Sequence, residues 1–443
     1  MVRLVGSCAI ATALAASLGL ALPRVALAQE ATGDTVQTFN PDTNAIDSVT
    51  YDRGRNISVL QRPRPDYQAE GIQVGGFTVY PKVTTSIAYD DNVFAVHVGP
   101  QGDFIFHVAP EVDFQSDWAR DSLSGYVRIS QDWDARFTSE DEFQYAGGLA
   151  GKLQFGQSDF TGGVDAGHYF LSRAVSNDFG FTVKPIDYDY YAFSGQLATE
   201  LTRVRLSLRV DDQIYDYENG VTGAGTPVIA DDQNHNSLIV TGKAEVAVSA
   251  DTAAYVLVKG NSQSYDFLPP ASPFNQNSDG YEIDGGADFD ITHLVRGEVQ
   301  LGYLRQEYDA AQFKPIDGFA AKAQLEWFPT ELTTVTGVAF RGVNDSLVPG
   351  SAGYLTTDGS IRVDHELLRN LILSADGWVG YDQYNGINRD DTRAGVDLSA
   401  NWLITRHVGV TFAYTYSVQN SRGVQTGPSF ADNRATVTLV LQR

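Results

Sequence analysis

The sequence predicts an all-β fold, a transmembrane antiparallel β-barrel of about eighteen strands with both termini on the same, periplasmic side. Alternating apolar and polar residues recur from about Phe77 to Arg443, and the connections between these runs alternate between short and long. No later stretch approaches the roughly 18 consecutive apolar residues of a membrane helix. An alternation of period two gives a strand one apolar and one polar face. Its persistence with unequal connections is typical of outer-membrane barrels.

The strand count comes from the connections. Eight tight turns recur, near 118–121, 155–158, 201–203, 249–252, 292–294, 329–332, 368–370 and 405–407. Nine longer connections, rich in Gly, Pro, Asn and Asp, lie between and beside them, among them 90–103, 176–188, 219–236, 268–279, 347–354 and 422–431. Together they join eighteen strands, an even number that places both termini at the tight-turn end. Sixteen strands is the main alternative.

The N-terminus predicts export. Arg3 precedes an apolar, Ala-rich stretch from Leu4 to Leu22, and Ala26-Leu27-Ala28 before Gln29 fits a small-residue cleavage site. We therefore expect residues 1–28 to be a Sec-type signal peptide cleaved between Ala28 and Gln29, the alternative being an N-terminal anchor. Cys8 is the only cysteine, so we expect neither disulfides nor thiol chemistry after cleavage.

Residues 29–76 differ from the rest of the chain. They are polar and contain Arg62-Pro63-Arg64-Pro65, which predicts a mostly irregular periplasmic arm before a barrel over residues 77–443. The arm is either a plug or docking segment, or a simple spacer.

The charge excludes one class of function. The chain has 31 Lys and Arg against 55 Asp and Glu, a formal net charge of −24, which argues against a nucleic-acid binder. A mean hydropathy of −0.20 would suit a soluble protein, but a barrel places its apolar residues at every second position, so this value is compatible with a membrane.

Aromatic residues gather at the expected strand ends. One set lies next to tight turns: Trp118, Phe155, Trp327, Phe328 and Trp402. Another lies near the opposite ends: Tyr89, Tyr215, Tyr265, Tyr308, Tyr381 and Tyr416. Two such girdles are expected at the two membrane interfaces. A soluble β-sandwich is the structural alternative, although the chain offers no second apolar layer to cover the outward faces.

The polar faces of the expected strands carry both signs of charge. The residues expected to line the lumen are Arg128, Asp132, Arg203, Arg205, Arg209, Lys243, Glu245, Glu282, Asp284, Asp288, Arg296, Glu298, Lys322, Glu326, Arg362, Asp364, Arg393 and Asp397. Barrels of 16 to 18 strands are wide enough for an aqueous lumen. These residues therefore predict a hydrophilic conduit, the alternative being cross-strand ion pairs that fill the interior.

Enzyme chemistry finds no support. None of the seven histidines lies in a metal-binding spacing, and neither a nucleophile elbow nor a phosphate-binding loop occurs, so we expect no catalytic residue, cofactor or metal centre. The pairs Asp90-Asp91, Asp231-Asp232 and Asp390-Asp391 could recruit divalent cations that bridge lipopolysaccharide phosphates, or they are solvated loop residues.

The first part of the expected barrel resembles a known family. Arg62 to Tyr67, Gly76-Phe77, Tyr80-Pro81, the stretch Tyr89-Asp90-Asp91-Asn92-Val93-Phe94 and Ala109-Pro110-Glu111-Val112 are similar to the opening of the proteobacterial "putative β-barrel porin 2" family. The resemblance implies a Gram-negative outer-membrane barrel. It also implies the outer-membrane exit for a secreted exopolysaccharide, working with a periplasmic or lipoprotein polysaccharide-export partner. It implies no catalytic residue.

Three functions remain open at this point. The first is polysaccharide export. The second is a general or cation-preferring diffusion porin, because an acidic lumen attracts cations. The third is a structural or adhesive surface barrel with a closed lumen. Outer-membrane lipid and lipopolysaccharide are the expected surroundings.

Overall fold

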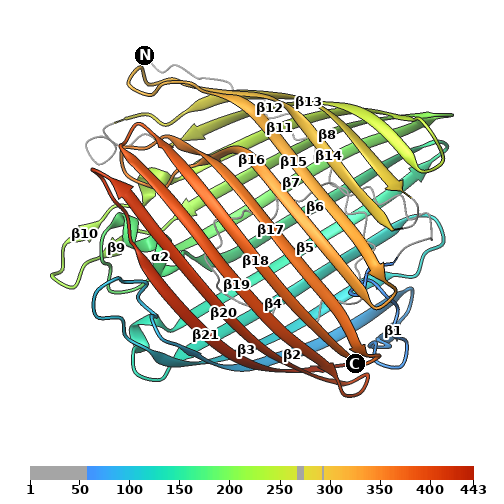
Figure 1. The fold of residues 1–443 in the computed structure, drawn as a ribbon, viewed down its shortest axis with the longest axis horizontal. Coiled ribbons are helices and arrows are strands. Elements are labelled where there is room, and N and C mark those ends of the chain that lie inside the picture. Colours follow the sequence, from blue (N-terminus) through green and yellow to red (C-terminus); the bar gives the residue numbers. More distant parts are fainter. Residues whose placement is uncertain (1–56, 267–273, 292–293) are drawn as a thin grey trace, which may run out of the picture.

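The computed structural model describes residues 57–443, except 267–273 and 292–293, and it is an all-β structure. Eighteen antiparallel strands form one closed barrel, as the alternating pattern predicted (Figure 1). The expected signal peptide, its cleavage site at Ala28 and Gln29, and the first part of the polar arm lie outside the described residues.

The barrel strands are 13 to 16 residues long. They are β2 (Phe77–Asp90), β3 (Asp103–Ser116), β4 (Ser122–Asp134), β5 (Glu142–Phe155), β6 (Ser158–Phe170), β7 (Asp187–Leu201), β8 (Val204–Tyr217), β11 (His235–Ala247), β12 (Thr252–Tyr265), β13 (Ser278–Ile291), β14 (Val295–Tyr308), β15 (Ile316–Thr330), β16 (Thr333–Asp345), β17 (Gly353–Leu368), β18 (Leu371–Asn385), β19 (Arg389–Leu403), β20 (Val408–Gly423) and β21 (Phe430–Gln442).

Closure of the barrel rests on the pairing of its first and last strands. Lys82 of β2 pairs with Gln442 of β21, and the ladder continues to Asp90 and Arg434. Every other barrel strand pairs with its neighbours in sequence, and β8 pairs directly with β11. A closed antiparallel sheet leaves no unpaired edge, so every barrel strand has a paired strand on both sides.

The two ends of the barrel differ. The tight turns lie at one end, and the longer connections lie at the other (Figure 1). Strand β2 starts and β21 finishes at the tight-turn end, where the Arg443 backbone N–H donates to the Pro81 carbonyl at 3.2 Å. The expected turn at 292–294 lies partly outside the described residues.

Short elements lie outside the barrel wall. At the long-loop end they are η1 (Thr138–Glu140), α2 (Arg173–Ser176), η2 (Asn177–Phe179), β9 (Gly220–Val221), β10 (Pro227–Val228) and η3 (Asp231–Gln233). At the tight-turn end, β1 (Ile72–Val74) forms a hairpin with β2. Among the described residues, no helix is long and apolar enough to cross a bilayer.

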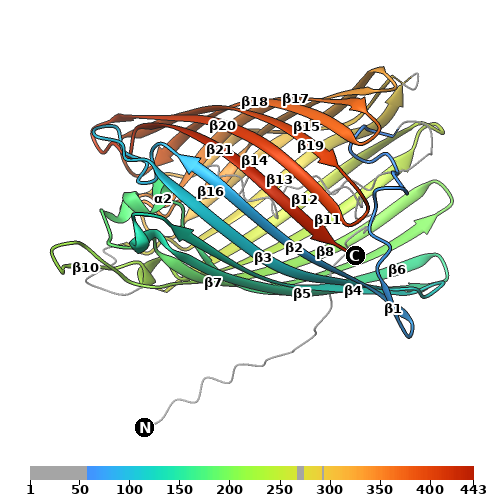
Figure 2. The same ribbon diagram turned by 90° about the horizontal axis from the view of Figure 1, so that it is seen from below.

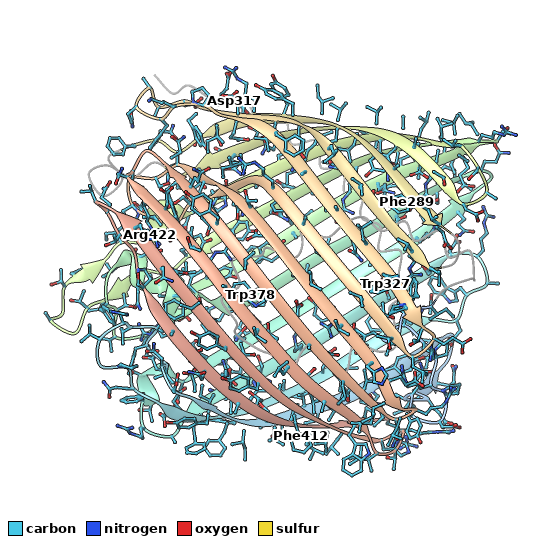
Figure 3. The ribbon with its side chains drawn as sticks, in the orientation of Figure 1. Phe289, Asp317, Trp327, Trp378, Phe412 and Arg422 are labelled. Carbon is cyan, nitrogen blue, oxygen red and sulfur yellow. The ribbon has the colours of Figure 1, made fainter. Side chains whose placement is uncertain are left out.

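The outer face of the barrel is apolar and exposed. Large hydrophobic side chains along every strand lie outward, such as Val379 at 61% and Phe412 at 50% exposure. Figure 3 shows the outer wall, with Phe289 and Trp327 toward the tight-turn end and Asp317 and Arg422 toward the long-loop end. Water solvates such a surface poorly and lipid solvates it well, so this band fits the hydrocarbon of a bilayer.

The two expected aromatic girdles are only partly present. Trp118, Phe155, Trp327 and Trp402 are exposed near the tight turns, but Phe328 is 9% exposed and lies inward beneath Arg296. It follows Trp327 directly, and adjacent residues of a strand face opposite sides. At the other end, Tyr89, Tyr381 and Tyr416 lie outward, whereas Tyr215, Tyr265 and Tyr308 occupy inward positions.

Candidate conduit and its two mouths

The register of the sheet determines which expected lumen residues face inward. Glu111 pairs with Arg128, Gln196 with Arg209, and the same face continues around the barrel. The residues that occupy inward positions are Arg128, Asp132, Arg205, Arg209, Lys243, Glu245, Glu282, Asp284, Asp288, Arg296, Glu298, Lys322, Glu326, Arg362, Asp364, Arg393 and Asp397.

Arg203 does not lie on the inner wall. It occupies the two-residue turn between β7 and β8 and is exposed at the rim. The preceding Thr202 has a φ of 56°, the left-handed conformation that lets the chain reverse within two residues. Alternation continues through Arg203 in the sequence, but the strand begins only at Val204, so the pattern overestimated its length.

Ion pairs on the inner wall lie both within and between strands. Lys243 Nζ lies 3.2 Å from Glu245 and 3.6 Å from Glu298, above the ring of Tyr255. Lys259 lies 3.3 Å from Glu282. The charged residues therefore compensate one another along the wall, as the ion-pair alternative predicted.

These ion pairs do not fill the interior. The side chains of Lys152 and Lys259 are each 34% exposed and that of Arg209 is 24% exposed, although all three point inward. An inward side chain can only have such exposure if water reaches the interior. The wall from β5 to β12 therefore borders an aqueous lumen.

The wall from β17 to β19 is packed more tightly. Arg393 bonds to Asp382 at 2.8 Å and to Asp358 at 3.0 Å, and the side chains of Arg393 and Asp382 are 6% and 2% exposed. Trp378 Nε1 donates to Asp397 at 3.0 Å, so an aromatic ring also belongs to the inner wall. Charge-assisted hydrogen bonds define the geometry of these side chains.

Carboxylates outnumber cations at the inward positions. Neutral side chains also bond to some of them: Asp165 accepts from the Tyr126 hydroxyl at 2.5 Å, and Asp284 accepts from Gln300 at 2.9 Å. A lumen lined by excess negative charge and surrounded by a low-dielectric wall concentrates cations.

The family follows from the whole barrel sequence. Residues 64–443 match the family described as "Putative beta-barrel porin 2". The chain belongs to this family. It is an outer-membrane β-barrel porin. No curated protein matches the porin in sequence.

Solved structures with a similar fold are distant in sequence. OccK2 (OpdF) of Pseudomonas aeruginosa, in complex with glucuronate, is 12% identical, with a TM-score of 0.45 over 84% of this chain and 100% of that one. OccAB2 of Acinetobacter baumannii has the same identity, TM-score and coverage. OccK5 (OpdH) of Pseudomonas aeruginosa is 10% identical, with a TM-score of 0.44 over 84% of this chain and 99% of that one.

At the long-loop mouth, the β6–β7 connection of the porin folds against other connections. Asp178 bonds to Arg389 at the start of β19, and Arg173 bonds to Glu140 of η1 at 2.5 Å. Asn177 Nδ2 donates to the Phe94 carbonyl in the β2–β3 connection at 2.9 Å. Burial raises the pKa of the Asp178 carboxyl, whereas the hydrogen bonds from Arg389 lower it.

An aromatic row on the inner wall supports this folded connection. His235 stacks between Tyr215 and Tyr265, with ring centroids 4.7 and 4.6 Å apart. The apolar cluster beside the row contains Ile186 from the β6–β7 connection and Leu347 from the β16–β17 connection. These connections therefore meet over the mouth.

A cavity of about 400 Å³ remains among the folded connections. Its lining comes from three of them and from Arg389: Asn177, Asp178, Phe181, Val348, Pro349, Arg389, Gln425, Thr426, Gly427 and Pro428. Arg389 is not among the residues predicted to line the lumen, although a cation two residues before a carboxylate recurs at Arg209-x-Asp211 and Arg362-x-Asp364. That spacing places both charges on one face of a strand and could have identified it.

The tight-turn mouth holds part of the polar arm. Arg64 Nη2 donates to Glu366 of β17 at 2.8 Å, and the Arg64 side chain is 2% exposed. Burial lowers the pKa of the Arg64 guanidinium, and Glu366 opposes this shift. The expected plug or docking role of the arm rested on composition alone, and its contacts with β17 were not predictable from it.

One acidic pair from the sequence lies at the seam of the barrel. Carboxylate oxygens of Asp90, Asp91 and Asp432 lie within 4.8 Å of one another. Asp91 accepts from the Asn433 backbone and side chain at 2.9 and 2.8 Å. These bonds connect the end of β2 to the start of β21.

Proposed function

We propose that the porin is a cation-preferring conduit for hydrophilic solutes, with its tight-turn end facing the periplasm. The water-accessible inner wall with its excess of carboxylates supports this proposal. An aqueous lumen lowers the barrier to moving a polar solute through hydrocarbon, and its fixed charge selects the sign of the ion that enters. In outer-membrane barrels the tight turns and both termini are periplasmic.

Planar-bilayer recording tests the conduit. In a potassium chloride gradient, we expect discrete conductance steps and a reversal potential on the potassium side. A reversal potential shifted toward the equilibrium potential of chloride would contradict the proposed cation preference. Absence of conductance in folded protein would favour the alternative of a structural or adhesive surface barrel. Folding is checked independently by the heat-sensitive electrophoretic mobility that closed barrels show.

Export of an exopolysaccharide is a second candidate, and one observation favours it. Segments of the chain occupy parts of both mouths, through the Asp178–Arg389 and Arg64–Glu366 ion pairs. A conduit that opens only when its cargo or partner binds needs segments that cover its mouths, whereas a constitutively open diffusion pore does not. The family resemblance adds an export partner on the periplasmic side.

Deletion of the gene tests this second candidate. We expect loss of one surface or secreted polysaccharide, with its polymer retained in the periplasm, and restoration by the intact gene. Unchanged amounts of every surface polysaccharide would remove export from consideration and leave the ion conduit unaffected.

A further inference from the structure

Residues 57–71, here called the strap, lie against the tight-turn end of the barrel. In Figure 2 this segment, drawn in blue before β1, runs along the right-hand end of the barrel. Gln61 accepts a bond from Arg296 of β14 at 2.6 Å, and the Val59 backbone N–H donates to Thr334 of β16 at 2.9 Å. Although the strap precedes β2 in sequence, it therefore contacts strands that lie far from β2 in the barrel.

Glu366 is the common anchor of the strap. Its Oε2 accepts from Arg64 at 2.8 Å and from Arg62 at 3.1 Å. Arg64 also donates to the Arg369 carbonyl in the β17–β18 turn at 3.1 Å and to the Val59 carbonyl at 2.9 Å. One guanidinium thus connects the strap, the inner wall and the rim.

The strap is inserted rather than lying on the surface. Val59 is 0% exposed, and the side chains of Arg64 and Glu366 are 2% and 6% exposed. Thr334, which receives the Val59 N–H, occupies an inward position and is 1% exposed. Part of the strap therefore occupies the entrance of the lumen.

The attachment of the strap differs from that of a barrel strand. Each of its bonds to the wall described above involves at least one side chain, and Pro63 and Pro65 have no backbone N–H to offer a ladder. A segment held by a few side-chain contacts can leave its site without breaking the sheet.

We propose that the strap is a gate of the tight-turn mouth and that Glu366 is its latch. The inference rests on the conduit function proposed above. With Arg62 and Arg64 bound to Glu366, the strap narrows the entrance. A periplasmic ligand or partner that competes for the strap would release it and widen the lumen.

Thiol labelling tests release of the strap without requiring conductance. In the full chain with Cys8→Ser and Val59→Cys, a polar maleimide should react slowly, because position 59 is buried. Adding Glu366→Gln should speed labelling by about tenfold or more, because a buried cation loses its charged partner. The matched control is Asp364→Asn, which removes another buried inward carboxylate of β17 that is paired with Arg362 instead.

A disulfide lock tests gating. In the Cys8→Ser background, Val59→Cys with Thr334→Cys should lower single-channel conductance when oxidised and recover it in dithiothreitol, whereas each single variant should not respond. Glu366→Gln should conduct more than Asp364→Asn. The disulfide variant retains both Arg64 and Glu366. It therefore still tests the gate if the Glu366→Gln protein fails to fold.

The outcomes separate the gate from the conduit. Equal labelling of the Glu366→Gln and Asp364→Asn proteins would overturn the latch. A locked protein that conducts as its reduced form does would overturn the gate. Absence of conductance in every folded variant would overturn the conduit and, with it, the gate, whatever the labelling rates.

Discussion

Arg389 and Asp178 form a 2.6 Å ion pair although 211 residues separate them in sequence. The side chains are 2% and 8% exposed, and Arg389 also bonds to Asp391 at 2.5 Å and lies above the ring of Tyr384. The pair fastens the β6–β7 connection to the opposite part of the wall. Together with the buried Arg173–Glu140 pair, it holds the connections of the long-loop mouth against one another.

Removal of Asp178 should release this connection. We expect Asp178→Ala to weaken the packing of the β6–β7 connection against the barrel by about 3 kcal/mol. This is the low end for breaking a buried ion pair, because Arg389 still has Asp391 as a partner. Hydrogen–deuterium exchange of residues 173–183 should accelerate strongly while the strands stay protected. Asp266→Ala, an exposed carboxylate at the same end, is the control, and equal exchange in both variants would refute the role of the pair.

Loss of a lumen cation should strengthen cation selectivity. Lys243 compensates the negative charges of Glu245 and Glu298. Lys243→Gln removes this positive charge from the lumen wall, so it should move the reversal potential further toward the equilibrium potential of potassium. The control is Arg305→Gln, which changes the net charge equally on the outward face of β14. If both variants shift the potential alike, the selectivity does not come from the lumen wall.

The sequence was sufficient for the strand number and for the inward face, because both depend on local periodicity. Alternation identified Lys243 and Glu298 as inward residues, and the turn spacing identified eighteen strands. The same rule failed at strand ends. Arg203 continues the pattern into a turn, and Phe328 faces inward although it adjoins a girdle residue.

The contacts at the two mouths were not predictable from periodicity. Period two assigns a face, but it does not assign a partner across the lumen. Arg64 and Glu366 lie 302 residues apart, and Arg389 and Asp178 meet only because the irregular β6–β7 connection folds toward the start of β19. Such pairs depend on the three-dimensional path of loops, for which a single sequence provides little physical constraint.

A glycine opposite Trp378 should be required for the packing of the inner wall. A Cβ at Gly395 would lie 2.4 Å from the Trp378 ring, whereas a Cβ at Gly377 would meet nothing within 4 Å. Gly395→Ala should therefore cost about 1–3 kcal/mol through overpacking. It should also move the indole away from Asp397 and change tryptophan fluorescence. Gly377→Ala is the control for the general effect of replacing a strand glycine, and similar unfolding free energies would contradict this packing argument.

The depth of a charge on the outer wall distinguishes a barrel in lipid from a β-protein in water. Val379 lies near the middle of β18 and is 61% exposed, while Leu367 lies near the tight-turn end of β17 and is 51% exposed. In a bilayer, Val379→Arg should cost about 2–4 kcal/mol and Leu367→Arg about 0–1 kcal/mol, because the charge at mid-depth has no water to solvate it. In water, both substitutions would be almost neutral, since both positions are exposed. Urea unfolding in phospholipid vesicles measures the difference, and equal free energies of unfolding for the two variants would place the apolar band outside the hydrocarbon.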